Sequence, residues 1–162
     1  MKRLITDWET KRRIVAEGTR WVRDGKFWLF GTATYYDAAN ISDRELKSDA
    51  KHFFNVLDRH LVPHKEFREG LRLPRLVFVE HGRSRTNPHF HFYIKGNCWH
   101  QYRQIHDAAP TCWKKKIRKS HSMVISDNLG PQHRRNGYGW KEFDSLYKET
   151  LLVDCCHLNF GD

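Results

Sequence analysis

Two histidines stand one residue apart in the stretch PHFHFYIKG, at positions 89 and 91. Alternate side chains of a β-strand point to the same face, so His89 and His91 can direct their ring nitrogens toward one ion. Glu80 ends the apolar run LVFV before them, where a carboxylate is costly without a partner. Two imidazoles and one carboxylate suit Mn²⁺, Fe²⁺ or Zn²⁺, and Mg²⁺ less readily, with open positions left for a substrate oxygen. The residue types therefore predict a divalent metal site at Glu80, His89 and His91.

The residues around the histidine pair separate several classes of protein that use a His-x-His pattern. Histidine-triad nucleotide hydrolases need a third histidine at the position that Tyr93 occupies. Cupins need a glutamate soon after the pair, but the following FYIKGNC contains no carboxylate. Two-histidine phosphoesterases need two H-x-T/S motifs, which this sequence lacks.

Three segments in order resemble the motifs of the HUH endonucleases, in particular their small single-tyrosine replication initiators (Rep proteins). FGTATYY at 30–36 is similar to the first motif, an apolar strand that ends in Thr or Tyr. HFH at 89–91, with Glu80 from the neighbouring strand, is similar to the second. The segment from Tyr138 to Lys141 reads YGWK and is similar to the third, Y-x-x-K on a helix. The three motifs span about residues 27–150, nearly the whole chain.

The resemblance implies a reaction and a role for each residue. Tyr138 is the expected nucleophile, which forms a phosphotyrosine with the 5′ end of the cut strand. Lys141 either favours the phenolate or positions the phosphate, and a bound Mn²⁺ or Mg²⁺ polarises the scissile phosphate. Tyr147 is a rival nucleophile, but its +3 position holds Thr150 in place of a lysine.

The resemblance also implies a substrate and partners. We expect a site-specific nickase and strand-transferase that acts on single-stranded DNA or an origin hairpin. Its expected role is to initiate rolling-circle replication of a plasmid, phage or other mobile element. The sequence has no G-x-x-x-x-G-K-[ST] motif, so a separate helicase is expected alongside a polymerase.

The overall charge favours a polyanionic partner. Lys and Arg number 29 against 19 acidic residues, which gives a net charge of +10. Basic residues interleave with six Trp, ten Phe and six Tyr, which can stack on bases. The basic residues near the motifs or in dense blocks are the expected DNA contacts: Arg83, Arg85, Lys95, Lys114, Lys115, Lys116, Arg134 and Arg135.

Other interpretations stay open at this point. A non-catalytic basic DNA-binding module with the same fold explains the charge equally well. A two-histidine, one-carboxylate metal oxidoreductase is a further possibility. Cys98, His100 and Cys112 are a conceivable zinc set without a recognised spacing.

The four cysteines include no C-x-x-C pair, and we expect reduced thiols in a cytoplasmic protein. No apolar run approaches the length of a membrane span, and the N-terminus lacks a signal-peptide core.

The pattern of the chain predicts one domain, residues 1–162, of the α+β class. Capping-box patterns at Thr6 and Ser42 begin two helices, the second ending at Pro63. The expected sheet is antiparallel and central, as in RRM-like cores, with helices against it. Its expected strands are residues 27–36, 75–81, 89–95, 121–126 and 151–160, and the other expected helices are residues 98–118, broken at Pro110, and 137–149.

Overall fold

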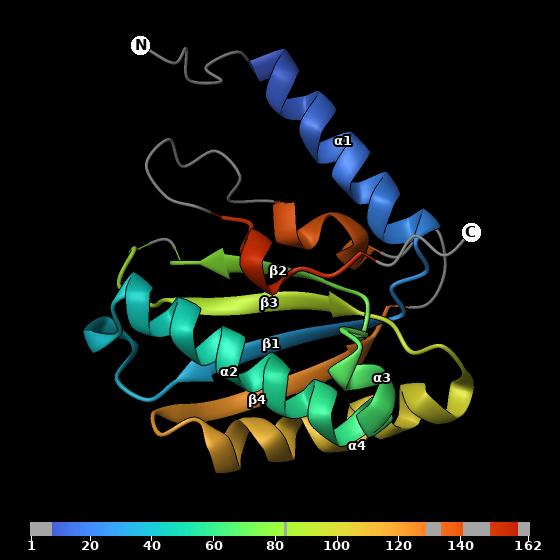
Figure 1. Cartoon of the computed structure of the whole chain (residues 1–162). Coiled ribbons are helices and arrows are strands. Elements are labelled where there is room, and N and C mark those ends of the chain that lie inside the picture. Colours follow the sequence, from blue (N-terminus) through green and yellow to red (C-terminus); the bar gives the residue numbers. More distant parts are fainter. Residues whose placement is uncertain (1–7, 83, 129–133, 141–149, 159–162) are drawn as a thin grey trace.

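The computed structural model describes residues 8–82, 84–128, 134–140 and 150–158. Its centre is a four-stranded antiparallel sheet with the strand order β2-β3-β1-β4, so the predicted α+β class with a flanked antiparallel sheet is confirmed. Figure 1 shows α2 crossing the sheet on one side and α1 rising beyond the β2 edge. The elements are α1 (Trp8–Asp24), β1 (Leu29–Tyr35), η1 (Ala38–Asn40), α2 (Asp43–Leu61), α3 (His64–Arg68), β2 (Arg75–Glu80), β3 (His89–Ile94), α4 (Trp99–Lys116), β4 (Ser120–Asp127), η2 (Arg134–Trp140) and η3 (Val153–Cys155).

Alternation along β3 divides the core into two layers. Phe90, Phe92 and Ile94 belong to the larger layer, which they share with residues of α2 and α4. Tyr93 belongs to a smaller layer on the other face, together with Val22 of α1 and Trp140 of η2. The predicted division of this strand into a helix-packed face and a histidine face is therefore confirmed.

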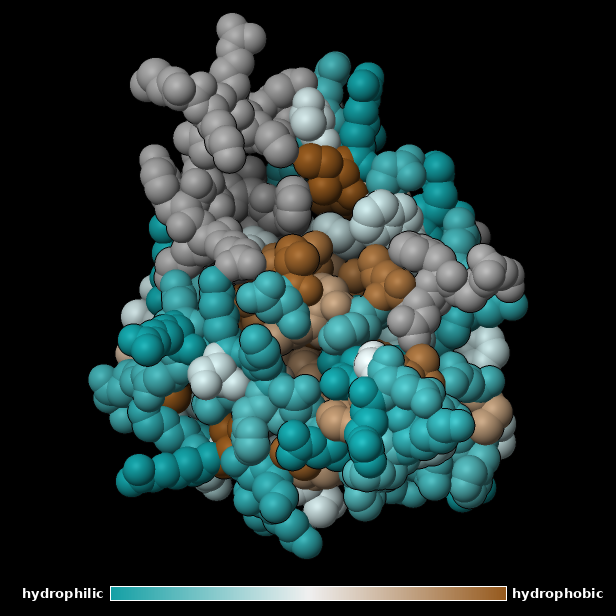
Figure 2. All heavy atoms as spheres, in the orientation of Figure 1, coloured by the Kyte–Doolittle hydropathy of each residue, from teal (hydrophilic) through white to brown (hydrophobic). Residues whose placement is uncertain are grey.

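Helix α2 begins and packs as its sequence predicts. The Ser42 hydroxyl accepts a hydrogen bond from the Glu45 backbone N–H, while the Glu45 carboxylate accepts one from the Ser42 backbone N–H. That backbone bond, with further bonds from Lys119 and the Ser42 hydroxyl, lowers the pKa of Glu45 to about 2. Figure 2 shows a mainly hydrophilic surface over α2, as expected for a helix whose apolar side faces the sheet.

Helix α4 corrects one prediction. Pro110 lies inside a continuous helix and does not break it. A proline removes one intrahelical hydrogen bond and crowds the preceding turn. The buried side chains of Ile105, Ala109 and Trp113 flank this position and anchor the helix to the larger core layer, so tertiary packing outweighs the local penalty.

The C-terminal region differs from the prediction in two ways. The helix expected at 137–149 is a short 3-10 helix, η2, over its described part, and residues 141–149 lie outside the description. The strand expected at 151–160 is reduced, as far as it is described, to isolated bridges from Leu151 to Phe78 and from His157 to Arg75. Between these bridges η3 turns Cys155 into the core, which interrupts strand geometry.

The structure bears on the cysteines and on membrane-spanning segments. All four cysteines are free, so no disulfide links them. In the described part of the chain, no helix is both long and apolar enough to cross a membrane.

Candidate metal centre

Glu80, His89 and His91 meet at one end of the β2–β3 hairpin. The register places Glu80 opposite His89 and Phe78 opposite His91, so all three site residues occupy the same face. Glu80 Oε2 lies 2.8 Å from His91 Nε2 and 3.6 Å from His89 Nε2. One ligand atom from each residue lies within 4.8 Å of the others, and each residue is at most 9 % exposed. The predicted convergence of these three residues is confirmed.

Neighbouring groups fix the orientation of both imidazole rings. His89 Nδ1 donates to the Asn87 carbonyl at 2.7 Å, since a carbonyl oxygen only accepts. In neutral His89 the Nε2 lone pair consequently faces the Glu80 carboxylate. His91 Nδ1 lies 2.9 Å from the Thr32 hydroxyl, which can donate or accept, and the His91 ring stacks on Phe30.

This arrangement fits a divalent cation. A lone pair directed at a carboxylate is electrostatically unfavourable unless a proton or a cation lies between them. Spacings of 2.8 and 3.6 Å are close to those between adjacent ligands of one ion, when metal–ligand distances are about 2.0–2.2 Å. Three ligands also leave coordination positions for a substrate oxygen.

Tyr138 lies next to His91, one of the three residues. Its ring packs edge-on against His91, with ring centroids 5.1 Å apart, and edge-on against Phe30 at 5.5 Å. The side chain is 41 % exposed, so a large substrate can reach it. It projects from η2 and not from the predicted α-helix.

Buried contacts hold η2 against the sheet. The Tyr93 hydroxyl donates to the Arg135 carbonyl and accepts from the Gly139 backbone N–H at 2.9 Å. Burial raises the pKa of Tyr93, so the hydroxyl keeps its proton and can donate. A Cβ at Gly139 would lie 2.7 Å from the Phe78 ring, so only glycine permits this close approach.

Trp140 fixes the end of η2 to helix α1. Its ring lies directly over Gly18, where an added Cβ would be 2.2 Å from the indole. Trp140 is buried, and it also packs edge-on against Phe78. Gly139 and Gly18 therefore allow the tight packing of η2 on β2 and α1, which places Tyr138 beside His91.

A cleft of about 570 Å³ opens over this centre. Its walls come from β1, β3, η2 and the β2–β3 loop, and its lining consists of Phe30, Thr32, Thr34, Asn87, His89, His91, Arg135 and Tyr138. Arg135, an expected DNA contact, therefore lies in the same cleft as the tyrosine and both histidines. Its guanidinium donates to the carbonyl of Asp127, the last residue of β4, at 3.2 Å.

The other expected site residues are placed as follows. Arg85 is exposed in the β2–β3 loop, with a positive φ of 57°. Arg83, Lys141 and the rival Tyr147 lie outside the described residues, and so does the Arg134 side chain.

Four of the expected basic residues are remote from the metal centre. Lys95 follows the opposite end of β3 and donates to the Gly25 carbonyl at 3.2 Å. Lys114, Lys115 and Lys116 form the last turn of α4, which packs on the other face of the sheet. The sheet therefore separates the three lysines from the cleft.

The conceivable zinc set is not assembled. Among the described residues, Glu80, His89 and His91 are the only group of three metal-ligand side chains that converge, and Cys98, His100 and Cys112 do not. Sequence reasoning also missed Thr32 and Asn87 as partners of the two histidines. The cross-strand register pairs Thr32 with His91, and that register is not visible in a local motif.

Comparisons with protein-family models, with curated proteins and with solved structures find no match for this chain.

Proposed function

We propose that this protein is a metal-dependent endonuclease that nicks and rejoins single-stranded DNA through a covalent phosphotyrosine at Tyr138. One observation carries the proposal: an exposed tyrosine packs against a histidine of a two-histidine, one-carboxylate cluster, in one open cleft. A nucleophile beside a candidate Lewis-acid site is the combination that phosphodiester transesterification requires.

The proposed step conserves the number of phosphodiester bonds. The Tyr138 hydroxyl gives up its proton and its oxygen attacks phosphorus, the bond between phosphorus and the 3′ oxygen breaks, and the 3′ oxygen takes up a proton. Tyr138 then carries the 5′ phosphate of the downstream fragment, and a free 3′ hydroxyl can reverse the reaction. A divalent cation held by Glu80, His89 and His91 would polarise a non-bridging phosphate oxygen.

Other groups of the cleft support an extended anionic substrate. Arg135 supplies a positive charge in the same cleft as Tyr138, and the Thr32 and Thr34 hydroxyls line its floor. The net charge of +10 favours nucleic acid over a neutral substrate. Joining as well as cutting suits the initiation of rolling-circle replication on a small genetic element, with a separate helicase and polymerase.

The direct test uses end-labelled DNA, because the nick sequence is not known. A pool of single-stranded oligonucleotides with a randomised centre is incubated with the protein and Mn²⁺, and covalent adducts are resolved on a denaturing gel. A 3′ label should enter the adduct and a 5′ label should not, because Tyr138 retains the downstream fragment. EDTA and the Tyr138→Phe variant should each abolish the band.

Matched variants separate the nucleophile from the metal ligands. Glu80→Gln and His89→Gln should lose Mn²⁺ binding and the adduct together, whereas Tyr138→Phe should lose the adduct and keep Mn²⁺ binding. Salt-dependent DNA binding without any adduct would instead identify a non-catalytic DNA-binding module. Tight Fe²⁺ binding with no affinity for DNA would favour the oxidoreductase alternative.

A further inference from the structure

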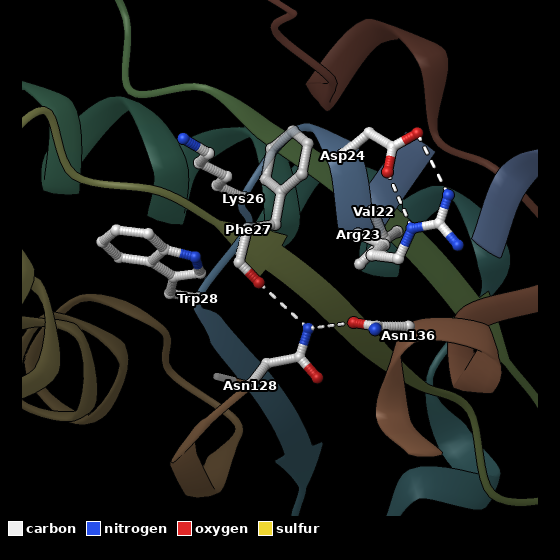
Figure 3. A pocket seen from close by; sticks show the side chains of 8 residues that line it. All are labelled: Val22, Arg23, Asp24, Lys26, Phe27, Trp28, Asn128 and Asn136. Atoms are coloured by element: carbon white, nitrogen blue, oxygen red, sulfur yellow. Dashed lines mark hydrogen bonds and ion pairs between the residues drawn. The ribbon is translucent and has the colours of Figure 1, made fainter. Parts of the chain in front are cut away.

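A second cavity lies on the other side of η2 from the metal centre. Its volume is about 430 Å³, and it is lined by Val22, Arg23, Asp24, Lys26, Phe27, Trp28, Asn128 and Asn136. Figure 3 shows the aromatic rings of Phe27 and Trp28, the Arg23–Asp24 pair, and the amides of Asn128 and Asn136 around it. Asn136 belongs to the same 3-10 helix that carries Arg135 and Tyr138 into the cleft.

The Asn128 amide joins the walls of this cavity and has one unused acceptor. Its nitrogen donates to the Phe27 carbonyl at 3.0 Å and to Asn136 Oδ1 at 2.7 Å, as the dashed lines of Figure 3 show. Its oxygen is buried and has no hydrogen-bond partner among the described residues. An unmatched buried acceptor is unfavourable, and an N–H donor from a ligand would complete it once the amide turns toward the cavity.

The loop that carries the aromatic wall is held in one conformation. Lys26 has a positive φ of 55°, which is uncommon for a residue other than glycine. Hydrogen bonds from the Gly25, Lys26 and Phe27 N–H groups to the last turn of α1 hold this turn. Trp28 projects from it with 41 % of its surface exposed, so a flat apolar face is presented without a need for reordering.

We infer that this cavity is a subsite for one unpaired nucleobase of the DNA strand. The base stacks on Trp28 and brings an N–H toward Asn128, while Lys26 lies beside its phosphate. The Arg23 guanidinium is paired with the Asp24 carboxylate, so Lys26 supplies the positive charge of this cavity. A planar ring with an N–H edge and a linked phosphate matches aromatic, acceptor and cationic groups together. A base in a duplex has its edge paired and both faces stacked, so the ligand is a base of a single strand.

This inference rests on the proposed function for its choice of ligand, because η2 connects the two cavities. A strand held at Tyr138 would pass Arg135 and place a neighbouring nucleotide at Asn136. The subsite would then help to fix which phosphate faces Tyr138.

The test measures binding with the chemistry removed. The Tyr138→Phe chain in EDTA is titrated with two fluorescent probes, a twelve-nucleotide thymidine oligonucleotide and an abasic oligomer with the same phosphates. Trp28→Leu should weaken binding of the thymidine probe roughly five- to a hundredfold, which is the range for loss of one base–aromatic stack, and leave the abasic probe nearly unchanged. Trp28→Phe should restore most of the affinity. The control Trp8→Leu removes a more exposed tryptophan at the far end of α1 and should not discriminate between the probes.

A second measurement does not depend on a substitution. In a nitrogen-resolved NMR titration, thymidine monophosphate should shift the side-chain amide signals of Asn128 and Asn136, and deoxyribose 5-phosphate should not. Three results would overturn the subsite. Trp28→Leu could weaken the binding of both probes equally, it could leave the binding of the thymidine probe unchanged, or the thymidine probe could fail to bind the chain at all. Because EDTA and Tyr138→Phe are used throughout, failure of the nicking assay and failure of this subsite are distinguished.

Discussion

The Thr32 hydroxyl should control the metal affinity of the centre although Thr32 is not a ligand. Its oxygen lies 2.9 Å from His91 Nδ1, while His91 Nε2 faces Glu80. When His91 Nε2 binds a cation, Nδ1 carries the proton and donates a hydrogen bond to the Thr32 hydroxyl. Thr32→Val keeps the shape and the β-branched side chain but removes this acceptor.

The size of the effect follows from the burial of His91. Only 4 % of this residue is exposed, so water does not easily replace the lost partner. A buried donor left without an acceptor costs about 1–3 kcal/mol. Removal of a hydrogen bond to a metal-ligating histidine typically weakens metal affinity by about 10- to 100-fold, or about 1.4–2.7 kcal/mol, so the two ranges agree.

The assay is a calorimetric titration with Mn²⁺ at constant pH, and Thr34→Val is the matched control. Thr34 lies on the same strand and lines the same cleft, but its hydroxyl contacts Ser122 and His121, which belong to β4. Thr34→Val should change Mn²⁺ affinity by less than about threefold, well below the shift expected for a metal-ligand partner. Equal losses in both variants, or none in Thr32→Val, would refute the reasoning.

Three further predictions test the supports of the site and the fold. Tyr93→Phe leaves the Arg135 carbonyl and the Gly139 N–H without their shared partner. The free energy of unfolding measured in urea should therefore fall by about 1–3 kcal/mol, and the adduct yield should fall with it. Unchanged stability would contradict this role of Tyr93. Gly139→Ala forces a Cβ against the Phe78 ring, so the free energy of unfolding should fall by about 1–3 kcal/mol. The adduct yield should also fall, while the affinity for Mn²⁺ is preserved. Loss of adduct yield and Mn²⁺ affinity together would argue against a role of Gly139 confined to η2. The pKa of Glu45 is lowered from 4.5 to about 2, so its carboxylate stabilises the folded state above pH 4.5 and this contribution is lost as the pH falls toward 2. Glu45→Gln should therefore lower the urea midpoint at pH 7, and the difference from the unchanged chain should shrink between pH 4.5 and 2; a constant difference would contradict the assignment.

The parts of the fold that follow from local patterns were predictable. Residues 89–94 alternate between two faces because successive strand side chains point in opposite directions, and this placed both histidines together. The Ser42–Glu45 capping box begins a helix by satisfying backbone groups locally. The convergence of Glu80, His89 and His91 was predictable to the same extent, because these residues lie on two strands joined by one loop, residues 81–88.

The parts that depend on contacts distant in sequence were not predictable. Pro110 remains in a helix because the residues around it pack in the core. Helix propensity is a local property of the sequence and does not include such tertiary contacts. The 3-10 geometry of η2 depends on Phe78, Tyr93 and Gly18, which come from three other elements. Thr32 became a partner of His91 only through the register of β1 on β3.

The most direct test of the account is the identity of the residue that carries DNA in the covalent adduct. The 3′-labelled adduct formed with Mn²⁺ is isolated, digested with protease and nuclease, and sequenced by mass spectrometry. The account predicts a 5′-phosphonucleotide on Tyr138, formed with Mn²⁺ and absent in EDTA. A nucleotide attached to another residue, or DNA binding in Mn²⁺ with no adduct at all, would contradict it.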